Sequence, residues 1–160
     1  LSFMKKGKVR MKRKLSILLA VGLIAGSLAL PSYAATAETV QEVQTIQTQY
    51  GEIQVETVLT VRDTALYSKT KSAEKTSTYR YAGSVIAKVT LEATFGYDGD
   101  SAWVVGTDSS HTTSGSWSYQ NERISESGNK AELTAKLTKL GAGTTYVDIS
   151  LSCTPSGQIS

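Results

Sequence analysis

The chain has 160 residues, enough for one domain of ordinary size. Its formal net charge is +3 at pH 7, but seven of the 17 Lys and Arg lie within the first 14 residues, so the rest of the chain carries a net charge of −4. A domain of that charge lacks the basic footprint that nucleic-acid binding requires and has no electrostatic attraction for anionic membranes. The single Cys excludes an intramolecular disulfide, so stability must come from a hydrophobic core.

Residues 1–34 have the layout of a secretory signal peptide. A basic stretch precedes an apolar run over residues 15–30, and Ser32 and Ala34 supply the small residues that precede a cleavage site. The apolar run is shorter than the roughly 20 residues that span a bilayer, which disfavours a retained anchor. We therefore expect cleavage after Ala34 and a secreted mature chain without a membrane anchor. Met4 and Met11 are alternative starts, so the residues before Met11 are a possible extension.

Residues 35–50 are predicted to form a polar N-terminal arm. Thr and Gln dominate this stretch, while its few apolar residues recur at spacings of three to four residues and permit a short amphipathic helix. An unstructured arm fits the thin apolar content equally well.

Residues 51–160 are predicted to form the folded domain. A first strand runs from Ile53 to Val61, where apolar and polar residues alternate. Residues 68–78 contain Ser, Thr, Lys and Glu with almost nothing apolar, which indicates a solvated connection. Gly83 is then predicted to mark a bulge or bend at the entry to the next strand.

The clearest strand runs from Val85 to Tyr97, because every odd position in it is apolar and most even positions are polar. Asp98-Gly99 follows and predicts a type I′ hairpin turn, with residues 103–105 as the returning strand. The polar residues 106–116 are predicted to form a loop.

The C-terminal part alternates strands and turns. Trp117 and Tyr119 indicate a short strand, and residues 125–130 a turn. Residues 131–140 fit a strand of period two, yet three of their leucines also share one helical face. The strand is favoured because the flanking elements are β. Residues 147–153 form a final strand with one apolar face.

An all-β fold follows from about six alternating strands joined by short polar turns, with no clear helix. We expect a single-domain antiparallel β-sandwich, with a small barrel as the alternative. The apolar faces of residues 85–97 and 147–153 are expected to form the two layers of its core. Cys153 continues the second face and is expected to be a buried, inert thiol.

A resemblance adds to this interpretation. It rests on Phe95-Gly96-Tyr97-Asp98-Gly99, Trp117-Ser118, the stretch from Ser125 to Ala131 and Ser150-Leu151-Ser152-Cys153, and covers roughly residues 80–160. In these segments the chain resembles uncharacterised small exported proteins of Gram-positive bacteria. The resemblance implies an immunoglobulin-like β-sandwich and secretion, and it supplies no activity and no site residues.

His111 is the sole His and follows Asp108, Ser109 and Ser110, which together are the residue types of a hydrolytic triad. Such residues must converge from a scaffold that orients the base, and neighbours on one flexible loop do not meet that condition. A small secreted hydrolase using the Asp108–His111 loop is therefore an alternative and not the favoured interpretation.

Asp98 and Asp100 are the candidates for a calcium site. Calcium takes six to eight oxygen ligands, and this turn supplies only two carboxylates and Ser101. Asp98-Gly99 already has a sufficient role as a turn. We expect no metal and no cofactor.

The candidate binding surface consists of aromatic residues and the sole His: Trp103, Trp117, Tyr119 and His111. At least one Trp is expected in the core. Exposure of both Trp residues on adjacent strands would favour a carbohydrate or protein contact surface.

These observations predict a secreted, non-enzymatic protein that binds a cell-envelope component, a host protein or another exported partner. The partner is a protein or a glycan, and no site is assigned beyond the candidate surface. Besides the hydrolase, a secreted toxin or bacteriocin-like effector is compatible with the small size.

Overall fold

The computed structural model describes residues 37–48, 51–63 and 69–160, so the predicted leader lies outside the described residues. The described part forms antiparallel strands and no helix. In chain order the strands are β1 (Ala37–Thr48), β2 (Gly51–Asp63), β3 (Thr70–Tyr81), β4 (Ser84–Tyr97), β5 (Ala102–Thr113), β6 (Ser118–Ser127), β7 (Lys130–Lys139) and β8 (Gly143–Ser152).

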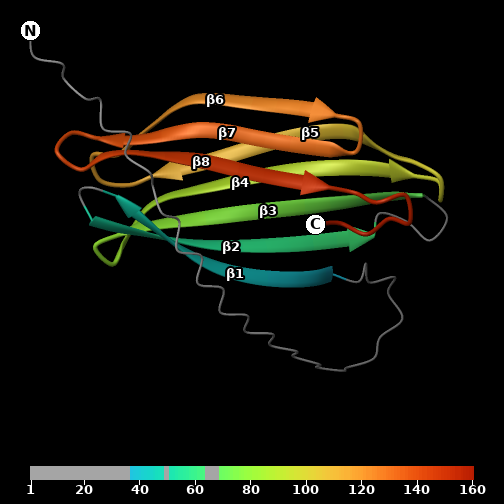
Figure 1. Ribbon diagram of the computed structural model, residues 1–160, viewed down its shortest axis with the longest axis horizontal. Helices are drawn as coiled ribbons and strands as arrows, with labels where there is room; N and C mark the ends of the chain where they lie inside the picture. Colours follow the sequence, from blue (N-terminus) through green and yellow to red (C-terminus); the bar gives the residue numbers. More distant parts are fainter. Residues whose placement is uncertain (1–36, 49–50, 64–68) are drawn as a thin grey trace, which may run out of the picture.

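The strands form two sheets, one of five strands in the order β1-β2-β3-β4-β5 and one of three in the order β6-β7-β8. The three-stranded sheet lies over the β3 to β5 part of the larger sheet, β2 still contributes buried residues to the core, and β1 is the far edge strand (Figure 1). The predicted all-β antiparallel fold is confirmed. Each strand pairs with its neighbours in sequence, whereas immunoglobulin sheets combine strands from distant parts of the chain.

The core lies between the inner faces of β2, β3 and β4 on one side and β7 and β8 on the other. It contains the two apolar faces expected from the sequence, and its largest fully buried side chains include Leu91, Phe95, Leu133, Leu137, Ile149 and Leu151. Val85 is an exception, since it is 39% exposed while the adjacent Ile86 is buried. A register shift between Tyr79 and Arg80 in β3 accompanies this change at the start of β4.

Three segments with few apolar residues are strands, which corrects the sequence interpretation. Residues 37–48 form β1 instead of a helix or a frayed arm, residues 70–81 form β3, and β5 continues through most of the predicted 106–116 loop. Thr and Ser satisfy one another across the ladder, as in the 2.8 Å hydrogen bond between Thr76 Oγ1 and Thr90 Oγ1. Backbone hydrogen bonds to adjacent strands therefore form strands in segments where the hydrophobic pattern predicted none.

The turns also differ from expectation. Ala82 and Gly83 both have positive φ, the pattern of a type I′ turn, and they link β3 to β4. The β4–β5 connection spans residues 98–101, and Asp98 is absent from the positive-φ residues, so the predicted type I′ turn there is wrong. Asp98 Oδ1 instead accepts hydrogen bonds from the N–H groups of Asp100 and Ser101 at 2.9 and 2.7 Å.

The prediction for residues 131–140 is confirmed. Residues 130–139 form β7, which is the central strand of the smaller sheet. Leu133 and Leu137 are fully buried, while Leu140 lies in the following turn and is fully exposed. The period-two pattern therefore described this segment correctly.

Candidate functional site

Trp103 lies on the outer face of the five-stranded sheet, the face directed away from the smaller sheet. It pairs with Gly96 of β4, whose neighbour Phe95 points into the core. A Cβ atom on Gly96 would come within 2.5 Å of the indole, so the ring occupies the space above this glycine. The side chain remains 44% exposed. Gly96 thus lets a large aromatic ring lie close to the sheet while it faces solvent.

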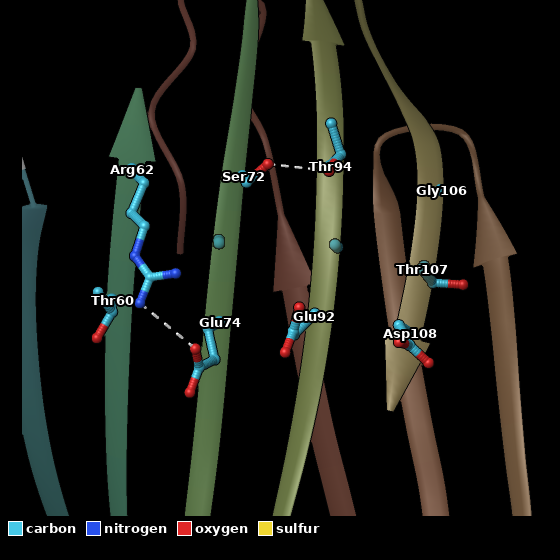
Figure 2. Close-up of a pocket in the computed structure, with 11 residues that line it drawn as sticks. Thr60, Arg62, Ser72, Glu74, Glu92, Thr94, Gly106, Thr107 and Asp108 are labelled. Carbon is cyan, nitrogen blue, oxygen red and sulfur yellow. Dashed lines mark hydrogen bonds and ion pairs between the residues drawn. The ribbon is translucent and has the colours of Figure 1, made fainter. Parts of the chain in front are cut away.

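A groove of about 290 Å³ crosses the same face next to Trp103 (Figure 2). The Thr94–Gly106 pair that borders it is the next outward-facing pair after Gly96–Trp103. Nothing lies within 4 Å of the Cβ position of Gly106, so the sheet surface at this glycine is open. The groove is lined by polar side chains from β2, β3, β4 and β5, among them Arg62, Ser72, Glu74, Glu92, Thr94 and Asp108.

Three carboxylates face one another across this groove. Glu74 of β3 is paired with Glu92 of β4, and Glu92 is paired with Asp108 of β5. Arg62 forms an ion pair with Glu74, with Nη2 and Oε2 3.7 Å apart. Like charges directly opposite on neighbouring strands are unfavourable by roughly 0.2–1 kcal/mol. This row therefore does not serve stability, and it presents closely spaced hydrogen-bond acceptors to solvent.

Trp117 does not belong to this surface. Its side chain is only 6% exposed and packs edge-on against Tyr81, with ring centroids 5.7 Å apart. The expectation of one core Trp is confirmed by Trp117, and its inclusion in the candidate binding surface is wrong. The alternation that predicted a strand at Trp117 did not reveal which side the indole faces.

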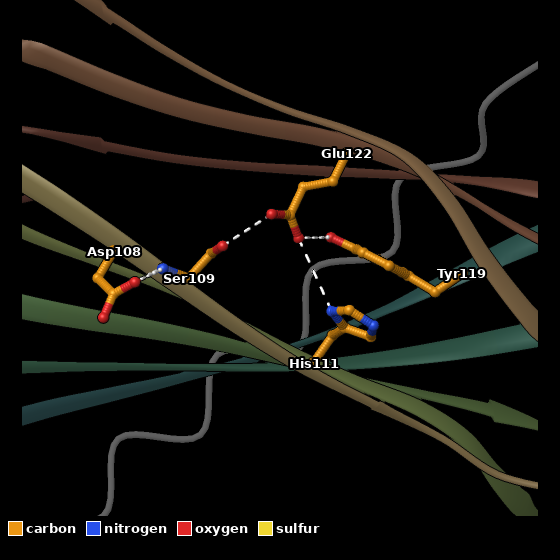
Figure 3. A network of polar contacts seen from close by, with 5 residues as sticks. All are labelled: Asp108, Ser109, His111, Tyr119 and Glu122. Atoms are coloured by element: carbon orange, nitrogen blue, oxygen red, sulfur yellow. Dashed lines mark hydrogen bonds and ion pairs between the residues drawn. The ribbon is translucent and has the colours of Figure 1, made fainter.

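His111 and Tyr119 meet in a polar contact between the two sheets (Figure 3). Their rings are stacked with centroids 3.9 Å apart. Tyr119 Oη donates a hydrogen bond to Glu122 Oε2 at 2.6 Å, and Ser109 Oγ donates to Glu122 Oε1 at 2.9 Å. Burial, followed by the hydrogen bond and charge of Glu122, raises the pKa of Tyr119.

A bulge in β6 places Glu122 at the centre of this contact. Pairing with β7 shifts between Gln120 and Arg123, and Asn121 has a φ of 57°. Asn121 and Glu122 are thereby left out of the ladder, and the Glu122 carboxylate is directed at β5 (Figure 3). Two edge strands of different sheets are joined in this way by side chains.

The order of these groups differs from that of a hydrolytic triad. In a triad the His lies between the nucleophile and the acid. Here Glu122 lies between Ser109 and His111, and its Oε2 is 3.8 Å from His111 Nδ1. Asp108 bonds to the Ser109 backbone N–H and not to the imidazole. Asp108, Ser109 and His111 lie on β5, not on the flexible loop expected from the sequence.

The remaining candidates have structural roles. Asp98 shapes its turn, and hydrogen bonds from the Ser101 and Asp100 backbones lower its pKa. Within the described residues, no group of three His, Cys, Asp or Glu is placed to hold a metal ion. Cys153 is buried as expected, and burial raises the pKa of its thiol, against the opposing charge of Lys71.

The groove residues were missed by sequence reasoning. Arg62, Glu74 and Glu92 lie on three strands, and only the pairing register brings them together. Because residues 68–78 were expected to be a solvated connection, the sequence offered no reason to place Glu74 on a sheet face.

No family model matches the chain, and neither a curated protein nor a solved structure matches it. Among residues 37–48, 51–63 and 69–160, no helix is long and apolar enough to cross a membrane.

Proposed function

We propose that this chain is an exported, non-enzymatic binding protein that recognises a glycan through the outer face of its five-stranded sheet. Export is supported by the basic and apolar segments of residues 1–34, which are followed by small residues. The immunoglobulin-like assignment is not part of the proposal, because the sequential strand order departs from that arrangement.

The exposed indole of Trp103 beside a polar groove is the observation that carries the proposal. A sugar ring has an apolar face that packs on an aromatic ring and hydroxyl groups that need hydrogen-bond partners around its edge. Trp103 supplies a ring 44% exposed and positioned over Gly96. Carboxylates at Glu92 and Asp108 supply acceptors, and Arg62 supplies donors, within the adjoining groove.

Binding is favoured over hydrolysis by the arrangement of the acidic and nucleophilic groups. Ser109 donates to Glu122 and not to His111, so the Ser–His pair of a hydrolytic triad is not formed. Among the described residues, Arg62 is the cation that forms an ion pair with a groove carboxylate, Glu74. We therefore favour binding over a hydrolase or a toxin because the exposed indole of Trp103 is a feature of recognition surfaces.

An array of bacterial cell-wall saccharides and animal glycans tests the proposal. The full chain should bind at least one saccharide, and Trp103→Ala should weaken that binding about tenfold, which corresponds to 1.4 kcal/mol. Tyr146→Ala is the matched control, because Tyr146 is 66% exposed but lies on β8 in the other sheet. Glu92→Gln should weaken binding without changing the position of Trp103.

Two results would contradict the proposal. The first is the absence of binding to any saccharide on the array. The second is equal binding by the wild type, Trp103→Ala and Tyr146→Ala proteins. Near-ultraviolet circular dichroism of each variant separates loss of the site from loss of the fold.

A further inference from the structure

β1 is an edge strand whose outer side has no described partner strand. It pairs with β2 in continuous register from Ala37 to Thr48, and it is the terminal strand in the sheet order. The smaller sheet contacts β3, β4 and β5, so β1 lies outside its cover (Figure 1). Val40 and Val43 are 52% and 46% exposed. An uncovered edge of this length is a template for a further strand.

By contrast, the backbone groups on the free edge of β8 have hydrogen-bond partners at alternate residues, from 148 to 152. The phenol of Tyr79 shares a hydrogen bond with the backbone of Asp148, and Lys75 Nζ donates to the carbonyl of Ser150 at 3.0 Å. Ser152 exchanges two backbone hydrogen bonds with Ser160, at 2.9 and 3.0 Å. The C-terminal half of the β8 edge is therefore closed by β3 and the C-terminal segment.

The edges of β5 and β6 are closed against each other. The N–H of Val104 donates to the carbonyl of Gly128 at 3.0 Å, and Thr107 Oγ1 donates to Glu126 Oε1 at 2.7 Å. Ser109 and Glu122 continue this contact, and the bulge in β6 interrupts its ladder. Of the four edge strands in the described part, β1 is thus the one without such closure.

The β1–β2 hairpin carries the acidic excess of the domain. Residues 37–63 contain five Asp and Glu and one Arg, whereas residues 64–160 contain nine acidic and nine basic residues. The net charge of −4 therefore arises entirely from the hairpin. The rest of the domain has no net charge, whereas the hairpin that forms the open edge is acidic. This edge therefore favours a cationic partner.

Neutral amides, not cations, contact three of these carboxylates. Gln44 donates to Glu42 at 2.8 Å, and Gln47 donates to Glu52 at 3.1 Å. Gln41 Nε2 donates to Glu56 Oε1 at 2.6 Å. Lys75 is within electrostatic range of Glu42, but no ion pair joins any of the three to a cation of the described residues.

We propose that β1 binds an extended, Lys- or Arg-rich segment of a partner protein as an added strand of the five-stranded sheet. Main-chain hydrogen bonds along the edge supply affinity, and the hairpin carboxylates select basic side chains. A second copy is a poorer occupant, because pairing two hairpins of the same charge brings their carboxylates together. The proposal uses a different surface from the glycan site and does not depend on it.

A labelled ten-residue peptide of alternating Lys and Val, titrated into the full chain by fluorescence anisotropy, tests this interaction. A peptide of alternating Lys and Pro has the same charge but lacks the N–H groups for a ladder at every second residue. We expect the Lys-Val peptide to bind at least tenfold more tightly. Amide exchange measured by NMR should slow at alternate residues of β1 and stay unchanged in β7.

Charge selection is tested with paired variants. The double variant Glu42→Gln, Glu56→Gln should weaken peptide binding roughly fivefold, because it removes two nearby carboxylates. The control Asp100→Asn, Glu132→Gln removes the same charge from the β4–β5 turn and from β7, and it should bind like the wild type.

Several outcomes would overturn the proposal. Equal binding of the two peptides would show attraction by charge alone, and equal affinity of the two double variants would remove the role of the hairpin carboxylates. Protection, before any peptide is added, of the alternate β1 amides that point away from β2 would show that the edge is already occupied. Sedimentation at two protein concentrations then identifies whether a second copy is the occupant.

Discussion

The imidazole of His111 in β5 stacks on the ring of Tyr119 in β6, with centroids 3.9 Å and planes 22° apart. The two residues belong to different sheets, so the stack joins the layers where the chain crosses between them. Glu122 adds hydrogen bonds from Tyr119 and Ser109 on the same side. This side of the sandwich is therefore closed by polar groups, while apolar side chains fill its centre.

Variants at Tyr119 should separate the ring contact from the hydrogen bond. Tyr119→Phe retains the stack and should lower the free energy of unfolding by about 1 kcal/mol, the net value of one hydrogen bond. Tyr119→Ala removes both contacts and should cost about 2 kcal/mol. Urea denaturation measures both values. Equal losses for the two variants would mean that the stack on His111 contributes nothing.

Leu137 and Leu140 form a matched pair for testing the register of β7. Leu137 is fully buried, and Leu140 is fully exposed in the turn after the strand. Leu137→Ala should lower the free energy of unfolding by about 2–5 kcal/mol, whereas Leu140→Ala should change it by less than about 0.5 kcal/mol. The helical alternative places both leucines on one buried face. Comparable losses measured by urea denaturation would support that alternative.

The same residues show why the sequence predicted some elements and not others. Where one face of a strand is buried, as at Leu133 and Leu137, alternation of apolar and polar residues reveals the strand directly. β1 has few apolar residues, and the buried positions of β3 are mostly small or polar, namely Ala73, Thr76, Ser77 and Tyr79, so backbone pairing places these strands where alternation is weak. These were the strands that sequence reasoning missed.

The candidate site was predicted only in part for a related reason. Trp103 stood out as a large aromatic residue, but its exposure depends on Gly96 in the neighbouring strand. Glu74, Glu92 and Asp108 are separated by 18 and 16 positions and meet only through the register of β3, β4 and β5. The pattern within a single strand does not specify how that strand is aligned with its neighbours, so the register could not be predicted from it.

Asp98 should make the stability of the β4–β5 turn depend on pH. Backbone hydrogen bonds from Ser101 and Asp100 lower its pKa in the folded state relative to the unfolded chain. The resulting stabilisation is present above the unfolded pKa, about 3.9, and is lost as the pH falls through the lower folded value. The melting temperature of Asp98→Ala should therefore lie below that of the wild type at pH 7.

The difference between these two melting temperatures should shrink as the pH is lowered below 4, because both proteins then lack the charged acceptor. Asp100→Ala is the control, since its carboxylate accepts none of the hydrogen bonds that hold the turn. A difference that stays constant from pH 7 to pH 2 would show that the Asp98 charge does not stabilise the turn.

Gly96→Ala should displace the indole of Trp103 without unfolding the sheet. A Cβ atom at this position would come within 2.5–2.6 Å of three ring atoms, so the ring must move outward. Gly96 is not among the glycines with positive φ, so Ala meets no backbone strain there. Tryptophan fluorescence should shift to longer wavelength, because Trp103 becomes more hydrated while Trp117 stays buried.

Gly106→Ala is the matched control, because it lies on the same face and its Cβ would have no atom within 4 Å. It should leave the fluorescence maximum unchanged. If the glycan proposal holds, Gly96→Ala should also weaken saccharide binding. The displaced indole would no longer be positioned to pack on a sugar ring bound in the groove. An unchanged spectrum for Gly96→Ala would mean that the indole does not occupy the space above residue 96, and the binding surface would have to be placed elsewhere.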